Sequence, residues 1–251
     1  MNKLLLGRFP VEKSALFVCD MQEKFASGIK YFPQIVANSK KLLESAKIMD
    51  IPVVYTEQYP KGLGHTVPEL NITEYSKDKF EKLQFSMMTP ELMKHLKGEL
   101  KHVNTVVLCG IETHACIRHT AIDLIDQGFN VHVVVDACSS RTMVDRKYAL
   151  KAIERMGANL ITTESAIFGY APDAGHPKFR MLRELLQQPS ADTCSSRTMV
   201  DRKYALKAIE RMGANLTTTE SAIFGYAPDA GHPKFRMLRE LLLQPSADTG
   251  L

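Results

Sequence analysis

The stretch that decides the fold reads Thr105-Val106-Val107-Leu108-Cys109-Gly110-Ile111-Glu112-Thr113-His114-Ala115-Cys116-Ile117-Arg118-His119-Thr120. It begins with a continuous apolar run, which is typical of a parallel β-strand that is covered on both faces. Gly110 lets the chain turn after this strand without a Cβ penalty. Apolar and small residues then recur at steps of three and four up to Gly128, which stands where a left-handed helix end belongs. The sequence therefore predicts a strand, a tight turn and a helix, with Cys116 in the first turn of that helix.

A cysteine in the first turn of a helix has a particular environment. The positive end of the helix dipole and the unpaired backbone N–H groups there favour the thiolate over the thiol. The same N–H groups can hold an oxyanion. The alternative is that Cys116 is a small buried apolar residue, as Cys19 and Cys109 are expected to be, because each lies inside an apolar strand run. Cys116 fits that role less well, since it follows the strand end among Glu, Thr and His residues.

The flanking sequence predicts a doubly wound α/β fold. Further strands are expected at residues 14–20, 52–56, 82–87, 130–136 and 159–163, and further helices near residues 33–46, 90–96, 142–156 and 177–186. Strands that alternate with helices at this spacing predict a parallel sheet. In such sheets ligands bind beyond the carboxyl ends of the strands. Asp20 and Cys116 are both predicted at such ends.

Length and composition are those of an ordinary globular chain. It has 251 residues, of which 45% are hydrophobic and 24% are charged. Its apolar runs reach only strand length and its N-terminus lacks a secretory pattern, so we expect no membrane span. Five scattered cysteines favour a reducing compartment, and we expect the cytoplasm, with the mitochondrion as the alternative. The net charge of +4 is mild and its basic residues are mixed with acidic ones, which argues against a nucleic-acid partner.

The C-terminal part of the sequence is a tandem repeat. Residues 138–193 recur as residues 194–249, and only Ile161, which corresponds to Thr217, and Gln187, which corresponds to Leu243, differ. Two copies of a helix-strand-helix fragment do not make a solenoid, which needs at least three stacked units. We therefore expect one domain over residues 12–193 and an appendage without independent function over residues 194–251. We expect the first copy to complete the sheet, because it follows the fifth strand directly.

Three side chains suggest a joint chemistry. Asp20 can act as a general base, Lys82 can stabilise a thiolate and a developing anion, and Cys116 can attack an electrophilic carbon. Each has an ordinary alternative, since a strand-end Asp is often a turn residue and a lone Lys is usually solvated. His114 and His119 flank the nucleophile, and we expect both to be surface or capping residues.

Four ordered segments resemble the isochorismatase-like cysteine hydrolases, and they are Phe17–Gln22, Lys82–Met87, Gly110–Ile117 and Val133–Arg141. The resemblance covers about residues 12–193. It implies a three-layer fold whose six-stranded parallel sheet has the order 3-2-1-4-5-6. It also implies a catalytic triad of Asp20, Lys82 and Cys116, with the backbone N–H groups of Ala115 and Cys116 as the oxyanion hole. A cis peptide bond between Ile111 and Glu112 is a further implication.

The sequence also departs from the patterns of this superfamily. Its nicotinamidases bind a metal through an Asp-x-His motif after the second strand, where this chain has Glu57-Gln58-Tyr59. His65 follows without a carboxylate at the expected spacing, so we expect neither a metal nor another cofactor. The pocket is instead expected to be lined by Phe25 and Phe85 beside the triad. Glu112 replaces the residue type that is usual in isochorismatase and nicotinamidase, so neither of those reactions is assumed.

The sequence thus predicts a homo-oligomeric hydrolase that uses a cysteine nucleophile on a small amide or a related small molecule. The alternative is a catalytically silent fold that acts as a protein-interaction module, which the duplicated tail would favour. A third hypothesis, a redox-sensing thiol protein, requires a resolving cysteine near Cys116. Cys19 and Cys138 are the candidates for that role.

Overall fold

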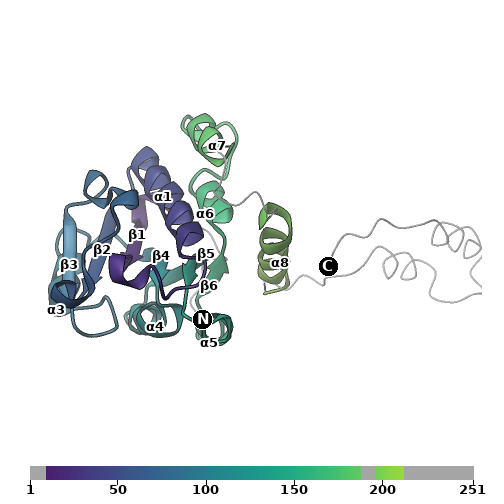
Figure 1. Ribbon diagram of the computed structural model, residues 1–251. Coiled ribbons are helices and arrows are strands. Elements are labelled where there is room, and N and C mark those ends of the chain that lie inside the picture. The colour runs from purple at the N-terminus through teal and green to yellow at the C-terminus, as the bar shows by residue number, and fades with distance from the viewer. Residues whose placement is uncertain (1–9, 188–195, 212–251) are drawn as a thin grey trace, which may run out of the picture. The chain divides into compact units, whose positions relative to one another are not determined.

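The computed structural model of the chain describes residues 10–187 and 196–211 (Figure 1). Its strands are β1 Ser14–Cys19, β2 Val53–Gln58, β3 Asp78–Lys82, β4 Thr105–Ile111, β5 Asn130–Ser139 and β6 Asn159–Ile161. Its α-helices are α1 Phe32–Met49, α2 Pro60–Leu63, α3 Pro90–Lys97, α4 Arg118–Asp126, α5 Met143–Arg155, α6 Thr163–Tyr170, α7 Phe179–Gln187 and α8 Ser196–Arg211.

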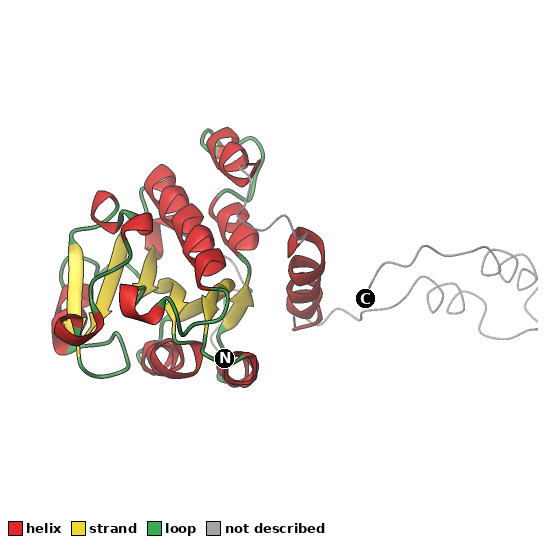
Figure 2. Ribbon diagram, in the orientation of Figure 1, coloured by secondary structure: helices red, strands yellow, loops and turns green. Residues whose placement is uncertain are grey.

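The six strands form one parallel sheet in the order β3-β2-β1-β4-β5-β6. Helices α1 and α6 cover one face of this sheet and α4 and α5 cover the other (Figures 1 and 2). The predicted three-layer, doubly wound fold is therefore confirmed. The chain winds outward from β1 to β3, and then outward in the opposite direction from β4 to β6. The crevice that binds ligands in such folds thus lies beyond the carboxyl ends of β1 and β4.

Strands β1 and β4 are buried along their whole length, as their continuous apolar sequences predict. They approach each other closely where Cys19 pairs with Gly110. A Cβ atom on Gly110 would lie 2.1 Å from the carbonyl oxygen of Cys19, and Gly110 has a φ of +117°. Only glycine fits such a contact. Gly110 thereby sets the spacing of the two strands whose ends form the crevice.

The third strand differs from the prediction, which placed it over residues 82–87. It spans Asp78–Lys82, where half-buried and exposed residues alternate and only Lys82 is buried. The reason is its place at the sheet edge, where one face meets solvent and an apolar run is not required. Met87 and Met88 are buried although they lie outside the strands, so their apolar character reflects core packing.

The segment after β4 also differs in detail. Residues Thr113–Ile117 form a π-helical turn, and the α-helix α4 begins only at Arg118. The prediction that Cys116 lies in the first turn of the α-helix is therefore wrong in this detail, because Cys116 lies in the π turn that precedes the helix. Gly128 has a φ of +84°, which confirms the left-handed helix end. Helix α6 was not predicted.

The sixth strand comes from the first copy of the repeat. Its residues Asn159–Ile161 pair with β5, as predicted. Helix α8 repeats the sequence of α5, and the chain divides into two compact units over residues 1–196 and 197–251. The rest of the second copy lies outside the described residues, as do residues 188–195. Within the described parts of the chain, no helix is long and apolar enough to cross a membrane.

Candidate active site

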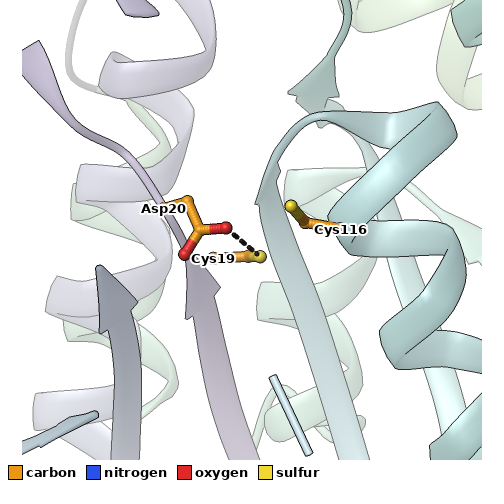
Figure 3. A group of neighbouring side chains, drawn as sticks. All are labelled: Cys19, Asp20 and Cys116. Atoms are coloured by element: carbon orange, nitrogen blue, oxygen red, sulfur yellow. Dashed lines mark hydrogen bonds between the residues drawn. The ribbon is translucent and has the colours of Figure 1, made fainter. Parts of the chain in front are cut away.

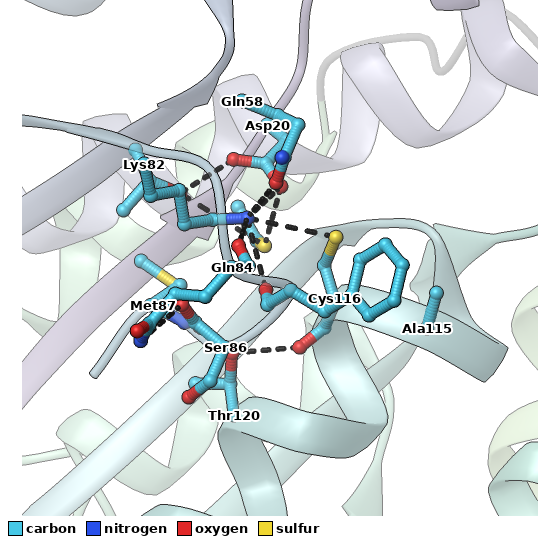
Figure 4. A network of polar contacts seen from close by, with 12 residues as sticks. Asp20, Gln58, Lys82, Gln84, Ser86, Met87, Ala115, Cys116 and Thr120 are labelled. Atoms are coloured by element: carbon cyan, nitrogen blue, oxygen red, sulfur yellow. Dashed lines mark hydrogen bonds and ion pairs between the residues drawn. The ribbon is translucent and has the colours of Figure 1, made fainter. Parts of the chain in front are cut away.

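Three strands bring the predicted triad together at one edge of the sheet (Figure 4). Asp20 directly follows β1, Lys82 is the last residue of β3, and Cys116 lies in the π turn after β4. Asp20 is 0% exposed, Lys82 4% and Cys116 6%. The sequence therefore places three functional groups in one nearly dry site.

Asp20 is fixed by contacts with β2. Its backbone N–H donates to the carbonyl oxygen of Thr56 at 3.1 Å. The hydroxyl of Thr56 donates to Oδ1 of Asp20 at 2.7 Å. The other carboxylate oxygen, Oδ2, accepts from Nζ of Lys82 at 2.6 Å. Both carboxylate oxygens thus have defined partners, which compensates for the burial of the charge.

The Lys82 ammonium lies between the carboxylate and the thiol. Besides its contact with Asp20, Nζ donates to Oε1 of Gln58 at 2.6 Å and to the carbonyl oxygen of Phe85 at 2.9 Å. It lies 3.6 Å from Sγ of Cys116 (Figure 4). These contacts hold a positive charge beside the sulfur, and this arrangement favours a thiolate.

The protonation of Lys82 reflects two opposing effects. Burial alone lowers the pKa of the Lys82 ammonium, but the neighbouring Cys19, Asp20 and Cys116 outweigh it, so the pKa is raised above its usual value. Opposite charges close to a buried group favour its charged form. Lys82 is therefore a cation throughout the physiological pH range.

The backbone groups of Ala115 and Cys116, which are expected to form the oxyanion hole, lie in the π turn. The carbonyl oxygen of Cys116 accepts from the hydroxyl of Thr120 at 2.7 Å. The N–H of Ala115 already donates to the carbonyl oxygen of Glu112 at 3.1 Å. Ala115 would have to share that hydrogen to bind an oxyanion as well. The role of the two N–H groups stays a prediction, and the peptide bond between Ile111 and Glu112 is cis, as the resemblance implies.

A second thiol lies in the site. Sγ of Cys19, Sγ of Cys116 and a carboxylate oxygen of Asp20 all lie within 4.8 Å of one another (Figure 3). The thiol of Cys19 donates to Oδ2 of Asp20 at 3.5 Å. Cys138, the other candidate for a resolving cysteine, lies in β5 with its Sγ 3.9 Å from the carbonyl oxygen of Leu108. The structure thus places Cys19 beside Cys116.

Two sulfurs and one carboxylate are ligand types that zinc accepts. The Lys82 ammonium, however, donates to Oδ2 of Asp20 at 2.6 Å and lies 3.6 Å from Sγ of Cys116. A metal ion at this place would lie next to a buried cation and compete with it for the same ligand atoms. In the described part of the chain no other group of three His, Cys, Asp or Glu residues has its ligand atoms this close together.

The position of the metal motif of nicotinamidases holds a different arrangement. Oε1 of Glu57 accepts from the N–H of Thr66 at 2.8 Å, and Oε2 lies 3.1 Å from Nδ1 of His65 and 3.4 Å from Nζ of Lys79. Burial raises the pKa of Glu57, but these hydrogen bonds and Lys79 outweigh it and lower the pKa. The spacing in the sequence did not reveal that His65 meets Glu57. This carboxylate is already neutralised by protein groups, and we derive no metal step from it.

Two phenylalanines and two histidines were predicted near the triad. Phe85 is exposed and its ring centroid lies 5.5 Å from that of His119. Phe25 is half-buried at the end of a 3₁₀ turn, and the role of both phenylalanines in the pocket stays a prediction. His114 and His119 hydrogen-bond through Nδ1 to Ser140 and to the carbonyl oxygen of Ala115, which fits structural roles.

Sequence reasoning missed Thr56 and Gln58, which hold Asp20 and Lys82 in place. Their position was a usable signal, because both lie near the carboxyl end of β2, next to β1.

Comparison with known proteins identifies the family and supports the fold. The family description that matches the chain is the isochorismatase domain, over residues 14–165. Human isochorismatase domain-containing protein 2 is 48% identical over 188 residues, which are 75% of this chain and 90% of the human protein. The solved structure of MAR1 ribonuclease from Caenorhabditis elegans is 47% identical, with a TM-score of 0.70 over 75% of this chain and 97% of that one. YcaC from Escherichia coli, described as an octameric hydrolase of unknown specificity, shares the fold at 19% identity, with a TM-score of 0.65 over 82% of this chain and 98% of YcaC.

Proposed function

Because this chain belongs to the isochorismatase family, within the isochorismatase-like hydrolase superfamily, we propose that it hydrolyses a small amide or a related small molecule with Cys116 as the nucleophile. The observation that carries the proposal is the position of the Lys82 ammonium. It lies 2.6 Å from the carboxylate of Asp20 and 3.6 Å from the sulfur of Cys116. A thiol, a base and a buried cation within reach of one another are what covalent acyl transfer requires.

In the first half of the reaction, Asp20 accepts the proton of the Cys116 thiol and the sulfur attacks the carbonyl carbon of the substrate. A carbon–sulfur bond forms, and the carbon–nitrogen bond breaks as Asp20 returns the proton to the leaving amine. In the second half, water attacks the thioester while Asp20 accepts its proton. The carbon–sulfur bond breaks, the acid leaves, and the proton returns to Cys116.

Lys82 supplies the electrostatic part of this mechanism. Its charge stabilises the thiolate before attack and the oxyanion that develops during both halves. Because the three groups are nearly excluded from solvent, little water screens that charge. The Cys116 N–H, with a shared contribution from Ala115, is proposed as the hydrogen-bond donor to the oxyanion.

Hydrolysis of RNA is the second candidate, because the 47% identical protein from Caenorhabditis elegans is described as a ribonuclease. The net charge of +4 over 251 residues is small for a chain that binds a polyanion. A buried thiol is also better suited to a small carbonyl substrate than to a nucleic-acid backbone. We therefore rank RNA below a small amide.

The remaining expectations are kept as proposals. We propose a homo-oligomer with a small-molecule substrate, without a nucleic-acid or membrane partner, in the cytoplasm with the mitochondrion as the alternative. Cys19, Cys109, Cys116 and Cys138 are all free thiols, which supports a reducing compartment. Residues 12–193 are proposed as the hydrolase domain and residues 194–251 as an appendage.

The test is a hydrolysis screen of the full chain against small amides and a structured RNA, with the Cys116→Ser and Cys138→Ser variants in parallel. Cys138 is a matched control because it is also a buried cysteine but does not belong to the cluster of Cys19, Asp20 and Cys116. We expect ammonia or amine release by the native chain and by Cys138→Ser, and its loss in Cys116→Ser. RNA cleavage that requires Cys116, without amide hydrolysis, would favour the second candidate. No turnover of any substrate would favour a catalytically silent interaction module.

A further inference from the structure

Cys19 has no role in the proposed hydrolysis, yet it lies beside the nucleophile. It is the last residue of β1, and Cys116 lies just after β4, the strand that pairs with β1. Their sulfur atoms lie within 4.8 Å of each other. A disulfide joins sulfurs about 2.0 Å apart, so the two atoms need to approach by less than about 3 Å. Cys116 lies in the π turn that follows β4, and its side chain points toward those of Cys19 and Asp20 (Figure 3).

We propose that Cys19 is a resolving cysteine that forms a reversible disulfide with Cys116 after a hydroperoxide has oxidised Cys116. The disulfide would block the nucleophile and protect it from irreversible oxidation. This inference rests on the proposed function only in taking Cys116 as the reactive thiol.

The chemistry consists of two balanced steps. In the first, the Cys116 thiolate attacks the hydroperoxide, a sulfur–oxygen bond forms, the oxygen–oxygen bond breaks, and the leaving oxygen takes up a proton. Cys116 is oxidised to a sulfenic acid while the hydroperoxide is reduced to an alcohol or to water. In the second, the sulfur of Cys19 attacks that of Cys116, the sulfur–sulfur bond forms, and the sulfur–oxygen bond breaks. The hydroxide leaves as water with the proton that Cys19 releases.

Asp20 is placed to assist the second step. The thiol of Cys19 donates to Oδ2 of Asp20 at 3.5 Å, so the carboxylate can accept the thiol proton and pass it to the leaving hydroxide. The Lys82 ammonium, which donates to the same oxygen, stabilises the hydroxide as it leaves. The groups that serve amide hydrolysis can therefore also close the disulfide.

The surroundings of the two thiols determine which of them reacts with the hydroperoxide first. Burial, followed by the neighbouring Cys116 and Asp20, raises the pKa of the Cys19 thiol well above its usual value. Cys19 therefore stays a thiol at neutral pH, and it is 0% exposed whereas Cys116 is 6% exposed. A hydroperoxide thus meets the Cys116 sulfur first, since reactivity follows thiolate character and access.

The test uses the full chain and a mass readout. The chain is treated with a slight excess of hydrogen peroxide, the remaining thiols are alkylated, and intact and tryptic masses are measured. We expect the mass to fall by that of two hydrogens and two fewer thiols to be alkylated. The tryptic peptide of residues 14–24 should be linked to that of residues 102–118, with fragmentation placing the bond at Cys116 and not at Cys109. Dithiothreitol should reverse the change. Oxygen additions at Cys116 without any linked species, at every peroxide dose, would overturn the proposal.

Two variants sharpen the result. In Cys19→Ala, Cys116 should gain two or three oxygens under the same treatment, because it has lost its resolving thiol. Cys138→Ser should still form the link. If Cys19→Ala does not fold, the peptide map of the native chain decides the question by itself. Because the readout is a mass and not turnover, failure of this proposal is distinguishable from failure of the proposed hydrolase activity.

Discussion

Nζ of Lys82 lies 2.6 Å from Oδ2 of Asp20, and this buried ion pair spans three neighbouring strands, from the edge strand β3 to the central strand β1. The two side chains are 0% and 1% exposed. Each charge is tolerated inside the protein only because the other is present. The pair therefore fixes the end of the edge strand as well as the environment of the Cys116 sulfur.

The first prediction is that this pair behaves as a unit in stability measurements. Lys82→Met and Asp20→Asn should each lower the free energy of unfolding by about 3–5 kcal/mol, because each leaves one buried charge unpaired. The double variant should lose less than the sum of the two. Urea unfolding of the four proteins measures the coupling. Additive losses would show that the two charges do not depend on each other.

The second prediction concerns the contact between β1 and β4. Gly110→Ala should lower the free energy of unfolding by more than about 3 kcal/mol, because a Cβ atom there would lie 2.1 Å from the carbonyl oxygen of Cys19. Gly128→Ala is the matched control, since Gly128 also has a positive φ but has open space around its Cβ position. It should cost only about 1–2 kcal/mol. Equal losses in thermal unfolding would mean that the close approach of the strands is not rigid.

The third prediction concerns pH. Burial lowers the pKa of His132 in β5 from 6.5 to about 3. Below pH 6.5 the unfolded chain therefore binds a proton at this histidine that the folded chain does not bind. The contribution of His132 to the free energy of unfolding is fully present above pH 6.5 and is lost progressively as the pH falls toward 3. Between pH 7.5 and pH 5 this group alone should remove about 2 kcal/mol of the free energy of unfolding.

Unfolding of the native chain and of His132→Gln at both pH values isolates this effect, because all other groups are common to the two proteins. The variant should show a smaller loss. The exposed His102 provides the control, and His102→Gln should lose as much stability as the native chain. An unchanged pH dependence in His132→Gln would contradict the assignment.

The fourth prediction concerns the repeat. A chain that ends at Thr193 should fold and keep its activity, because β6 of the first copy already pairs with β5. The matched control deletes residues 138–193 and so joins the second copy to β5. Its sequence differs from that of the chain ending at Thr193 only by Thr217, Leu243 and two additional residues at the C-terminus. Ile161 is half-buried, so the control should be less stable by about 1 kcal/mol. Failure of the shorter chain to fold would show that the second copy is needed.

The sequence predicted the parts of the fold that rest on continuous apolar runs. Strands β1, β4 and β5 are covered on both faces, and each contains a continuous run of apolar residues. The edge strand β3 could not be placed in this way, because its sequence is mostly charged and only its last residue, Lys82, is buried. The π turn before α4 spans only the five residues Thr113–Ile117, which are too few for hydrophobic periodicity to distinguish it from an α-helix.

The candidate site, like the fold, was predictable from the sequence only in part. The strand-end positions of Asp20 and Cys116 follow from the alternation of strands and helices, whereas the grouping of Lys82 with them as a triad was implied by the family resemblance. The distance between Cys19 and Cys116 depends on the register of β1 against β4 and on the rotation of the π turn, and neither is encoded in a local pattern. The meeting of Glu57 with His65 likewise depends on the path of the intervening loop.

The central claim is that Cys116 is an acyl-accepting nucleophile, and the most direct test uses an activated acyl donor. The full chain is mixed with p-nitrophenyl acetate at neutral pH, quenched in acid at short times, and mapped by mass spectrometry. Acetyl should appear first on Cys116, within the tryptic peptide of residues 102–118, and its formation should slow at least about tenfold in Lys82→Met, which loses the charge beside the sulfur. Lys79→Met, a change of the same kind within β3, should leave that rate unaltered. Acetyl that accumulates on Cys138 or on surface lysines as fast as on Cys116 would contradict the account.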